Sequence, residues 1–378
     1  MVRMPMTVKP IDDLSDALYS AYPELVAVHD LAAGRPVYLV GGAVRDLLLG
    51  HGRADIDLVI EGNAAALATR LGGEVVEHER FATAKAQLGE HEVDIATARA
   101  ETYPRPGDLP EVEPTAGIAD DLARRDFTIN AMAIPLQRDP ELIDPHRGRE
   151  DLEAGLLRVL HSRSFEDDPT RALRAARYGA RFGFELEPET AALIRAADLG
   201  AVSADRRRAE LLRLAAEPEA ARGFELLGEW GLVDLRAEGV ALAARVAELL
   251  ASPPWQGVAP RDRALLAAAL GPPGGEEDLV AAHPQKPSLA VEMADRREPV
   301  ELVLARALGA EWLDRYLLGW RQVALEIGGE DLLAAGVRQG PAIGRGLKEA
   351  LIRKLDGEIS GREQELRVAV EAARWAAP

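Results

Sequence analysis

The sequence predicts an α+β protein, in which a mixed sheet of about five strands with flanking helices is followed by an all-helical remainder. The predicted sheet lies within residues 35–145, where short apolar runs bounded by glycine are typical of buried strands. From residue 150 onward, helical patterns dominate. Ala, Leu, Arg and Glu are abundant and aromatic residues make up only 4% of the 378 residues, which favours helices. A chain of this length exceeds one ordinary core, so several domains are expected.

The predicted elements of the first part follow one another closely. Residues 11–34 are expected to form one leading helix that ends near Gly34. The apolar run Val37–Val40 predicts a buried strand that enters a tight turn at Gly41-Gly42. Further strands are predicted at Ile56–Ile60, Glu74–Val76, Thr83–Leu88 and Glu92–Ala96, with helices at Ala43–Leu49 and Ala64–Leu71.

Proline and glycine mark the interruptions of the chain. Four prolines and one glycine fall between Ala100 and Pro114, counting Pro114 itself, and predict a long surface loop, because proline is excluded from helix interiors and central strands. The composition shifts again at residues 252–260 and 271–288, which are rich in proline and glycine. These two stretches are predicted to be linkers.

Helices are predicted along the second part of the chain. Asp168-Pro169 is expected to start a helix that runs to about Gly179, and Gly183 is expected to break the segment after that helix. No internal repeat accompanies these patterns. The other predicted helices cover residues 189–198, 204–216, 298–308, 311–326 and 345–356.

Composition and charge exclude several classes of protein. Cysteine is absent, so disulfides and thiolate metal sites are excluded. The net charge of −18 argues against a protein that coats nucleic acid through bulk attraction. Arginine is nonetheless clustered, which favours a local RNA contact, at positions 171, 174, 177, 181, 206–208 and 213. No apolar run approaches the roughly eighteen residues of a membrane helix, and no signal-peptide core is recognised, so we expect a cytoplasmic protein without membrane contact.

Three aspartates are candidates for a metal site. Asp55 and Asp57 are two residues apart, so on a strand both carboxylates point to the same face. Two like charges this close are unfavourable without a cation between them, and oxygen ligands in this arrangement suit Mg²⁺. Asp94 on a neighbouring strand is the candidate third acid of a two-metal site, which would serve in-line attack of a terminal hydroxyl on an α-phosphate. Taken alone, the Asp-x-Asp pattern also fits a solvated strand end.

The turn before these aspartates has the residues of a phosphate site. Gly41 and Gly42 let backbone N–H groups approach a phosphate closely, and Arg45 can add a bidentate contact. A helix that starts after this turn would aim its positive end at a triphosphate. Asp46 is expected either to cap that helix or to hold Arg45 in place.

Four segments together are similar to a known family. They are LVGGAVRDLLLG at 39–50, ADIDLVI at 54–60, RRDFTINAMA at 124–133 and DDPTRALRAARYGARFGF at 167–184. In this order they resemble the class II tRNA nucleotidyltransferase and poly(A) polymerase family, which belongs to the polymerase β superfamily. The resemblance covers roughly residues 37–235, and RRDFTINAMA is its most specific part.

The resemblance implies a polymerase-β-like catalytic head followed by an all-helical neck, body and tail. The implied division is an N-terminal helical lead at 1–34, the head at 35–148, a base-recognising neck at 149–205, the body at 206–290 and a tRNA-binding tail at 291–378. Asp144-Pro145 matches the junction of head and neck, where flexing is expected to reset the pocket between additions.

Roles for individual residues also follow from the resemblance. Asp55 and Asp57 would hold the metals, with Asp94 as the third catalytic acid. The phosphates and ribose of the nucleotide would be bound by Gly41, Gly42, Arg45, Arg124, Arg125, Asp126 and Asn130. The base would be read by Asp167, Asp168 and Arg171, although the family commonly has Glu where this chain has Asp167. Arg174 and Arg177 would make further nucleotide or RNA contacts, or balance an acidic protein.

The activity that the resemblance implies is template-independent, Mg²⁺-dependent transfer of CMP or AMP from CTP and ATP to the 3′ end of tRNA, with release of pyrophosphate. No membrane and no obligatory protein partner are implied. Partial enzymes that add only CC or only A are alternatives. Poly(A) tailing is disfavoured, because the region after Glu79 lacks an Arg-rich string. A noncatalytic RNA-binding protein with the same fold, or an enzyme that modifies a small molecule or a protein, represents other classes.

Overall fold

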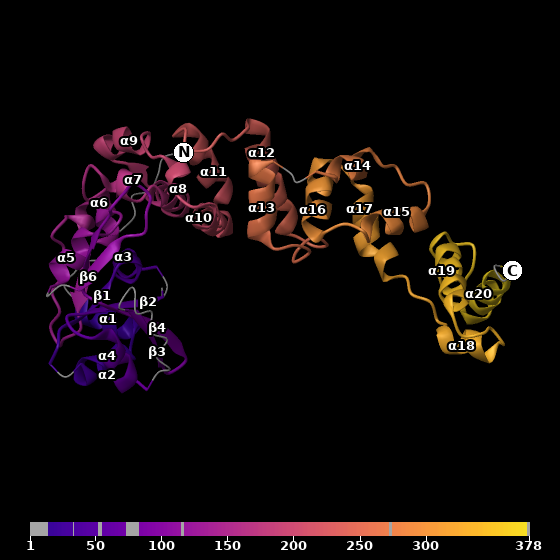
Figure 1. The fold of residues 1–378 in the computed structure, drawn as a ribbon, viewed down its shortest axis with the longest axis horizontal. Helices are drawn as coiled ribbons and strands as arrows, with labels where there is room; N and C mark the ends of the chain where they lie inside the picture. The colour runs from indigo at the N-terminus through magenta and orange to yellow at the C-terminus, as the bar shows by residue number, and fades with distance from the viewer. Residues whose placement is uncertain are drawn as a thin grey trace. The chain divides into compact units, whose positions relative to one another are not determined.

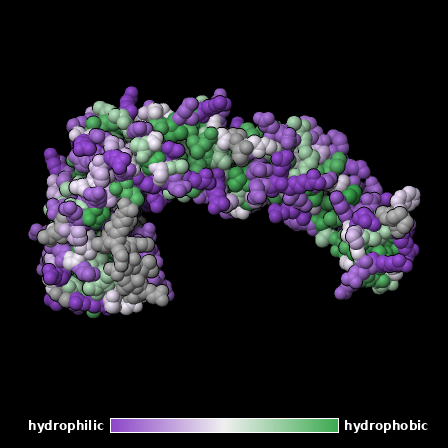
Figure 2. Space-filling model, in the orientation of Figure 1, coloured by the Kyte–Doolittle hydropathy of each residue, from purple (hydrophilic) through white to green (hydrophobic). Residues whose placement is uncertain are grey.

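The computed structural model describes residues 14–32, 34–51, 55–72, 83–114, 117–271 and 274–375. The chain divides into two compact units, Met1–Asp234 and Leu235–Pro378, whose elements are labelled in Figure 1. Among the described residues, we find no helix with the length and apolarity to span a membrane. Figure 2 shows hydrophilic side chains over much of the visible surface of each unit, interrupted by smaller hydrophobic groups.

A five-stranded mixed sheet organises the first unit, in the strand order β3-β4-β2-β1-β7. The β2–β4 pair is parallel and the other three pairs are antiparallel. The predicted strand at Glu74–Val76 lies outside the described residues, whereas β7, which was not predicted, takes the edge next to β1. The strands are β1 Val37–Val40, β2 Ile56–Ile60, β3 Thr83–Leu88, β4 His91–Thr97 and β7 Ala133–Pro135. The predicted α+β class with about five strands is confirmed.

Both faces of the sheet are covered, and the alternation along β1 shows how. Val37 and Leu39 belong to the larger core, which includes residues of later helices and of four helices near this sheet: α1 Leu14–Ala21, α2 Leu25–Leu31, α3 Gly42–Leu49 and α4 Ala64–Arg70. Tyr38 and Val40 point to the opposite face, which is covered by α5 (Ile118–Ala123). Because successive strand residues face opposite sides, α5 packs against the face that the other four helices leave open.

Two predictions in this region need correction. The single leading helix predicted over 11–34 is wrong, because α1 and α2 are separated at Pro23, which has no N–H to continue a helix. The long loop predicted over 100–114 is wrong in part, because β5 (Arg99–Thr102) and β6 (Glu111–Pro114) pair as an antiparallel hairpin. Three of its prolines fall in the connecting tip, and Pro114 stands at the end of an edge strand, where proline is tolerated.

The rest of the first unit is helical apart from the two-residue strands β8 (Leu156–Leu157) and β9 (Glu185–Leu186). Its helices are α6 Gly148–Ala154, α7 Ser164–Asp167, α8 Thr170–Phe182, α9 Pro188–Ile194, α10 Ala204–Ala216 and α11 Ala220–Glu229. Helix α8 does not end at Gly179 as predicted but runs on to Gly183, whose φ of 67° ends it. A Cβ on Gly179 would lie 2.7 Å from Leu226 Cδ1, so this glycine serves the close contact of α8 with α11.

The second unit is helical in all its described elements. Its helices are α12 Ala237–Leu250, α13 Arg261–Leu270, α14 Glu276–Ala281, α15 Pro287–Ala294, α16 Pro299–Leu308, α17 Trp312–Leu318, α18 Gly329–Ala334, α19 Pro341–Leu355 and α20 Arg362–Trp375. The predicted linker 252–260 does connect α12 to α13. The predicted linker 271–288 is wrong, since it contains α14 and the start of α15. Leu279 of α14 is fully buried, and its carbonyl accepts from Trp312 Nε1 at 3.0 Å, which anchors this segment.

Candidate active site

A cleft of about 650 Å³ opens in the first unit. It is lined by the β1–α3 turn, the start of β2, the β5–β6 hairpin, the segment after α5, and helices α8 and α10. Eight of its lining residues are arginines and six are acids. A protein of net charge −18 therefore presents one local surface in which cations outnumber acids.

The three predicted acids meet at one end of the sheet. Asp57 in β2 stands opposite Asp94 in the parallel β4. Because Ile56 and Leu58 are buried in the larger core, the exposed Asp57 points to the other face. Asp55 precedes β2 by one residue and lines the cleft with Asp57. Asp57 and Asp94 also line a smaller cavity of about 240 Å³. We call Asp55, Asp57 and Asp94 the acidic edge.

The charges at the acidic edge are only partly balanced. Burial raises the pKa of Asp57 to about 6, with the nearby Arg125 opposing this effect and the charges of Asp94 and Asp55 adding to it. Solvent reaches Asp57 through the cleft, while protein atoms enclose the carboxylate on its other sides. Asp94 lies 3.5 Å from the ammonium group of Lys85 on β3, so its charge is partly neutralised. Asp57 is thus the carboxylate that would gain most from a bound cation.

The donor set of the acidic edge fits Mg²⁺. All its ligand atoms are carboxylate oxygens, and Mg²⁺ is usually bound through one or two carboxylates together with substrate phosphates and water. Within the described part of the chain, no three acidic or histidine side chains converge into a ready cluster.

The turn after β1 brings backbone and arginine close together. Gly41 has a φ of 68° and a ψ of −131°, a conformation that residues with a Cβ avoid. A Cβ on Gly41 would lie 2.7 Å from Nη1 of Arg125. Helix α3 begins at Gly42, and both glycines line the cleft. The predicted phosphate turn therefore stands beside a guanidinium, at the N-terminal end of a helix.

Arg45 is buried at the margin of the cleft, with only 4% of its surface exposed. Its Nε donates to Asp46 Oδ1 at 2.8 Å, and its Nη1 donates to Asn130 Oδ1 at 2.7 Å. The guanidinium also lies 4.6 Å from the ring centroid of Phe182. Of the two roles predicted for Asp46, the structure shows the one in which it holds Arg45, since α3 has no side-chain cap.

Arg124 and Arg125 share one buried carboxylate, that of Asp121 in α5. Arg124 donates to its Oδ1 at 3.0 and 2.7 Å, and Arg125 donates to its Oδ2 at 3.3 and 2.9 Å. Arg124 also donates to Glu101 Oε1 at 2.8 Å. Burial alone would raise the pKa of Asp121, but Arg125 and Arg124 outweigh it and hold the pKa below its usual value. We call Arg124, Arg125, Asp121 and Glu101 the arginine cluster.

Asp126 and Asn130 connect α3 with α8 through buried polar contacts. Asp126 Oδ1 accepts from Asn130 Nδ2 at 3.0 Å and from the N–H of Phe127 at 2.8 Å. Asp126 Oδ2 lies 2.7 Å from Nη2 of Arg174. Burial alone would raise the pKa of Asp126, but Arg174 and the hydrogen bonds keep it low. The predicted ribose-binding acid is thus 4% exposed, with two donors on Oδ1, while Oδ2 faces the charge of Arg174 without a hydrogen bond.

Asp168 and Arg171, two of the three predicted base-reading residues, both line the cleft. Asp168 Oδ1 accepts from Nη2 of Arg206 in α10 at 3.0 Å. Arg171 donates to Ser164 Oγ at 2.6 Å and to the carbonyl of Arg124 at 2.8 Å. The two predicted base-reading residues are therefore held by contacts with α10 and with the segment after α5.

The third predicted base-reading residue, Asp167, is not among the residues that line the cleft. Its carboxylate lies 3.3 Å from Nη2 of Arg163, which is largely exposed. By contrast, Arg174 and Arg177 both line the cleft, and Arg177 lies 3.6 Å from Glu217. The side chains of consecutive residues 167 and 168 thus point to different surroundings, because helix α7 ends between them.

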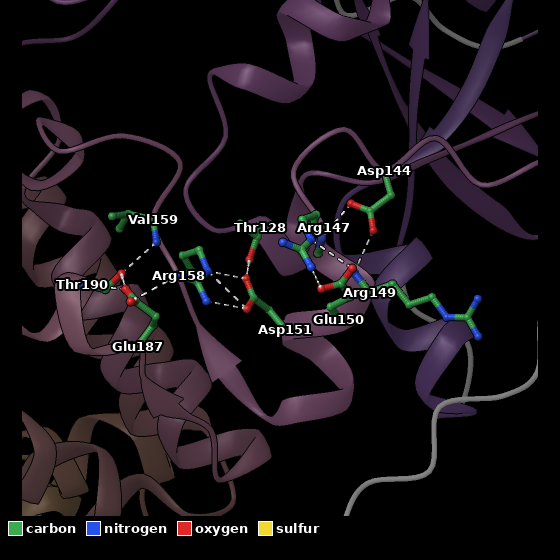
Figure 3. Close-up of polar contacts among 11 residues, drawn as sticks. Thr128, Asp144, Arg147, Arg149, Glu150, Asp151, Arg158, Val159, Glu187 and Thr190 are labelled. Carbon is green, nitrogen blue, oxygen red and sulfur yellow. Dashed lines mark hydrogen bonds and ion pairs between the residues drawn. The ribbon is translucent and has the colours of Figure 1, made fainter.

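Hydrogen bonds and ion pairs connect the segments of the junction that follows β7, as Figure 3 shows. Asp144 accepts from the first two N–H groups of α6 at 2.7 and 2.9 Å. Thr128 donates to Asp151 at 2.7 Å, Asp151 accepts from Arg158 at 3.0 Å, and Arg158 lies 3.2 Å from Glu187. This chain of contacts ties the RRDFTINAMA segment to α9. The flexing expected here stays a prediction.

Sequence reasoning missed Glu101 and Tyr103, which line the cleft, and Asp121, which supports two of its arginines. A local signal existed for Asp121, which precedes Arg124 and Arg125 by three and four residues, the spacing of ion pairs on a helix. Glu101 and Tyr103 stand in the hairpin that was predicted to be a loop, and Tyr103 donates to Glu101 Oε2 at 3.2 Å. No local signal marks either of them, because only the tertiary fold brings them to the cleft.

Comparison with known proteins places this geometry in a family. Residues 37–158 match the poly A polymerase head domain, and residues 183–236 match the probable RNA and SrmB-binding site of polymerase A. The CC-adding tRNA nucleotidyltransferase of Deinococcus radiodurans is 36% identical over 356 residues, which cover 90% of each chain. The chain belongs to the class II tRNA nucleotidyltransferase and poly(A) polymerase family. The resemblance inferred from the four sequence segments is thereby confirmed.

Other members of this family support the fold. The A-adding tRNA nucleotidyltransferase of Halalkalibacterium halodurans is 48% identical over 204 residues, and the chain spans about half of that relative, 48% of its length. A solved CCA-adding enzyme in an apo form is 29% identical with a TM-score of 0.77, over 95% of this chain and 99% of that one. The Thermotoga maritima CCA-adding enzyme complexed with tRNA is also 29% identical, with a TM-score of 0.73, over 95% and 98% of the two chains. The predicted head with a helical remainder is confirmed.

Proposed function

We propose that this chain is a template-independent nucleotidyltransferase that transfers CMP, AMP or both from CTP and ATP to the 3′ end of tRNA, with release of pyrophosphate. The observation that carries the proposal is the cleft that Asp55 and Asp57 of the acidic edge line together with Glu101, Arg124 and Arg125 of the arginine cluster. Carboxylates alone suit a cation and arginines alone suit an anion, whereas the two together suit a nucleoside triphosphate with its metal. Relatives named for adding CC, A or CCA to tRNA support the acceptor and both nucleotides.

In this proposal Asp55 and Asp57 hold Mg²⁺, with Asp94 as the third acid. When bound there, Mg²⁺ supplies Lewis-acid stabilisation of the charge that develops on the transferred phosphate and the leaving pyrophosphate. Gly41 lets the backbone approach the triphosphate, because no Cβ stands between the turn and the ligand. Arg125 places its guanidinium beside that turn and pairs with phosphate oxygens.

Base selection and RNA binding complete the proposal. Asp168 offers acceptors and Arg171 offers donors, which together can distinguish the edges of cytosine and adenine. Arg174 and Arg177 on the same helix bind phosphates of the acceptor strand or of the nucleotide. The head at 35–148 and the neck at 149–205 carry the chemistry, and the body and the tail, which begins at residue 291, contact the tRNA.

Partial addition is the second candidate, and two observations favour it. The 48% identity to an A-adding enzyme covers half of this chain, which favours addition of the terminal A alone. The match to a CC-adding enzyme covers 90% of the chain, which favours addition of the two cytidines. The candidate activities can be distinguished because each one extends a tRNA with a different 3′ end.

Three tRNA transcripts provide the test, ending in the discriminator base, in C and in CC, each incubated with labelled CTP or ATP and Mg²⁺. Extension of all three to CCA supports the complete activity. Extension of only the first two with CTP, or of only the third with ATP, assigns a partial enzyme. A long homopolymer of A would assign poly(A) synthesis instead. If none of the three transcripts is extended, the proposed function is wrong.

A further inference from the structure

We infer that Asp121 is the positioning residue that holds Arg124 and Arg125 in the orientation that binds the triphosphate. This inference rests on the proposed function and concerns a residue that neither the sequence motifs nor the family resemblance assigned. Asp121 is fully buried and is not among the residues that line the cleft. It therefore does not meet the substrate and acts through the two arginines.

The hydrogen bonds of Asp121 divide evenly between the two guanidiniums. Oδ1 accepts from Nε and Nη2 of Arg124, and Oδ2 accepts from the same two atoms of Arg125. A carboxylate has about four lone-pair positions, so these four N–H groups saturate it. Because each oxygen serves one arginine, the carboxylate fixes both guanidiniums relative to each other.

The position of Asp121 in α5 makes this possible. It stands one helical turn before the arginines, so its side chain lies beneath theirs. Each arginine side chain is only 16% exposed, and two neighbouring cations buried to this degree need a counter-charge. Without it, two side chains with several rotatable bonds each would gain entropy and solvation by swinging into the open cleft.

The contacts of Asp121 place Arg125 beside the turn at Gly41, which is predicted to bind phosphate. Nη1 of Arg125 takes the space that a Cβ on Gly41 would occupy, at 2.7 Å from that position. The other side of the cluster is held by Glu101, which accepts from Nη1 of Arg124 at 2.8 Å. Asp121 and Glu101 thus orient the two guanidiniums before a ligand binds, and only Asp121 of these two acids contacts both arginines.

The first test compares two neighbouring acids of α5. Asp121→Asn keeps the shape of the side chain but replaces one acceptor by a donor that faces guanidinium N–H groups. We expect KM for CTP or ATP to rise on the order of tenfold, the effect of losing one charge-assisted contact, while kcat and KM for tRNA change by less than about threefold. Asp120→Asn is the matched control, since Asp120 is exposed on the same helix, and its KM should equal that of the wild type.

A double-mutant cycle separates positioning from general support of the fold. In an Arg125→Ala background, the effect of Asp121→Asn on KM should shrink to less than about threefold, because one of the groups that it positions is gone. A tenfold effect in both backgrounds would overturn the inference. Should Asp121→Asn not fold, Arg125→Lys keeps the charge but cannot make both bonds to Oδ2. It should raise KM to the same extent, and an unchanged KM would equally overturn the inference.

The same comparison distinguishes failure of this inference from failure of the proposed function. Calorimetric binding of CTP and ATP to the full chain does not depend on extension of any tRNA. If the wild type binds a nucleotide and Asp121→Asn weakens that binding, the positioning role holds even for a chain that extends no tRNA. If nucleotide binding is equal in the two proteins, the positioning role is wrong whatever the acceptor.

Discussion

Asp55 and Asp57 of the acidic edge line the same cleft as Glu101, Arg124 and Arg125 of the arginine cluster, but the two regions differ in how their charges are balanced. At the acidic edge, no salt bridge joins Asp57 to a cation in the part of the chain that the structure describes, and its pKa is raised to about 6. In the arginine cluster, both guanidiniums are paired with buried acids, and the pKa of Asp121 is lowered. The negative charge of Asp57 is therefore left without a paired cation, whereas the positive charges of Arg124 and Arg125 are balanced by acids of the protein.

The difference indicates which half of the site is complete before substrate arrives. The arginines are already oriented, so binding an anion there needs little reorganisation, which is the condition under which fixed charges help catalysis most. The acidic edge is incomplete, because Asp57 is destabilised as a carboxylate until a cation is near it. The nucleotide and its metal would therefore complete the acidic edge and dock onto a finished arginine cluster.

The largest expected effect comes from removing the unbalanced charge. Asp57→Asn should lower the rate of nucleotide transfer on the order of a thousandfold, about 4 kcal/mol, because one carboxylate of the proposed metal site is lost. Single-turnover extension of a tRNA transcript measures this rate. Glu92→Gln on β4 is the control, since it also removes an acid from the sheet but stands in an exposed pair with Lys85. A rate within tenfold of the wild type for Asp57→Asn would contradict the metal role.

The second largest effect is expected when Arg125 of the arginine cluster is displaced by a substitution at Gly41. Gly41→Ala places a Cβ 2.7 Å from Nη1 of Arg125 and should raise KM for the nucleotide by about ten- to a hundredfold, as one or two contacts are displaced. Gly34→Ala is the matched control, because Gly34 also has a positive φ of 76° but meets no atom within 4 Å. Both variants should lose about 1–2 kcal/mol of stability in thermal unfolding. Equal KM values for the two variants would show that the contact with Arg125 is unimportant.

Those two regions also differ in how far the sequence could predict them. The acidic edge follows from local rules, since the period of two along a strand places Asp55 and Asp57 on one face. Adding Asp94 requires only that the two strands be neighbours, which the parallel β2–β4 register provides. The five-stranded sheet and helices such as α10 were predictable for the same reason, because apolar patterns and glycine or proline breaks are local.

The contact of the arginine cluster with Glu101 could not be predicted without the tertiary structure. Glu101 reaches Arg124 only because the β5–β6 hairpin forms outside the main sheet, in a segment whose prolines predict a loop. The roles of Asp126 and Arg45 depend on Asn130, which bridges them through contacts 4 and 85 residues apart in sequence. Such pairings between distant segments leave no periodic pattern in a single sequence.

The third prediction concerns the cost of the unbalanced charge in the metal-free protein. Since the pKa of Asp57 is raised above that of an unfolded aspartate, the folded state disfavours its ionisation. The resulting loss of stability is absent below the unfolded pKa of about 4, grows as pH rises and is complete above about 6. Asp57→Asn removes this loss, so the midpoint of thermal unfolding in EDTA should rise more at pH 7.5 than at pH 5. A gain that is equal at both pH values would contradict the shifted pKa.

The smallest expected effect concerns the two consecutive acids that are proposed to read the base, since only one of them lines the cleft. Asp168 lines the cleft and is held by Arg206, whereas Asp167 lies outside it and pairs with the exposed Arg163. Asp168→Asn should change the ratio of CTP to ATP incorporation about tenfold, because the amide presents a donor where the carboxylate presented an acceptor.

Asp167→Asn should change that ratio by less than about twofold, since Asp167 lies outside the cleft and pairs with a largely exposed arginine. Competition between labelled CTP and ATP on a single tRNA transcript measures both variants under the same conditions. If Asp167→Asn shifted the ratio as far as Asp168→Asn, the base would have to reach beyond the cleft to the end of α7. Asp167 would then also contribute to base selection, although it does not line the cleft in the protein without a nucleotide.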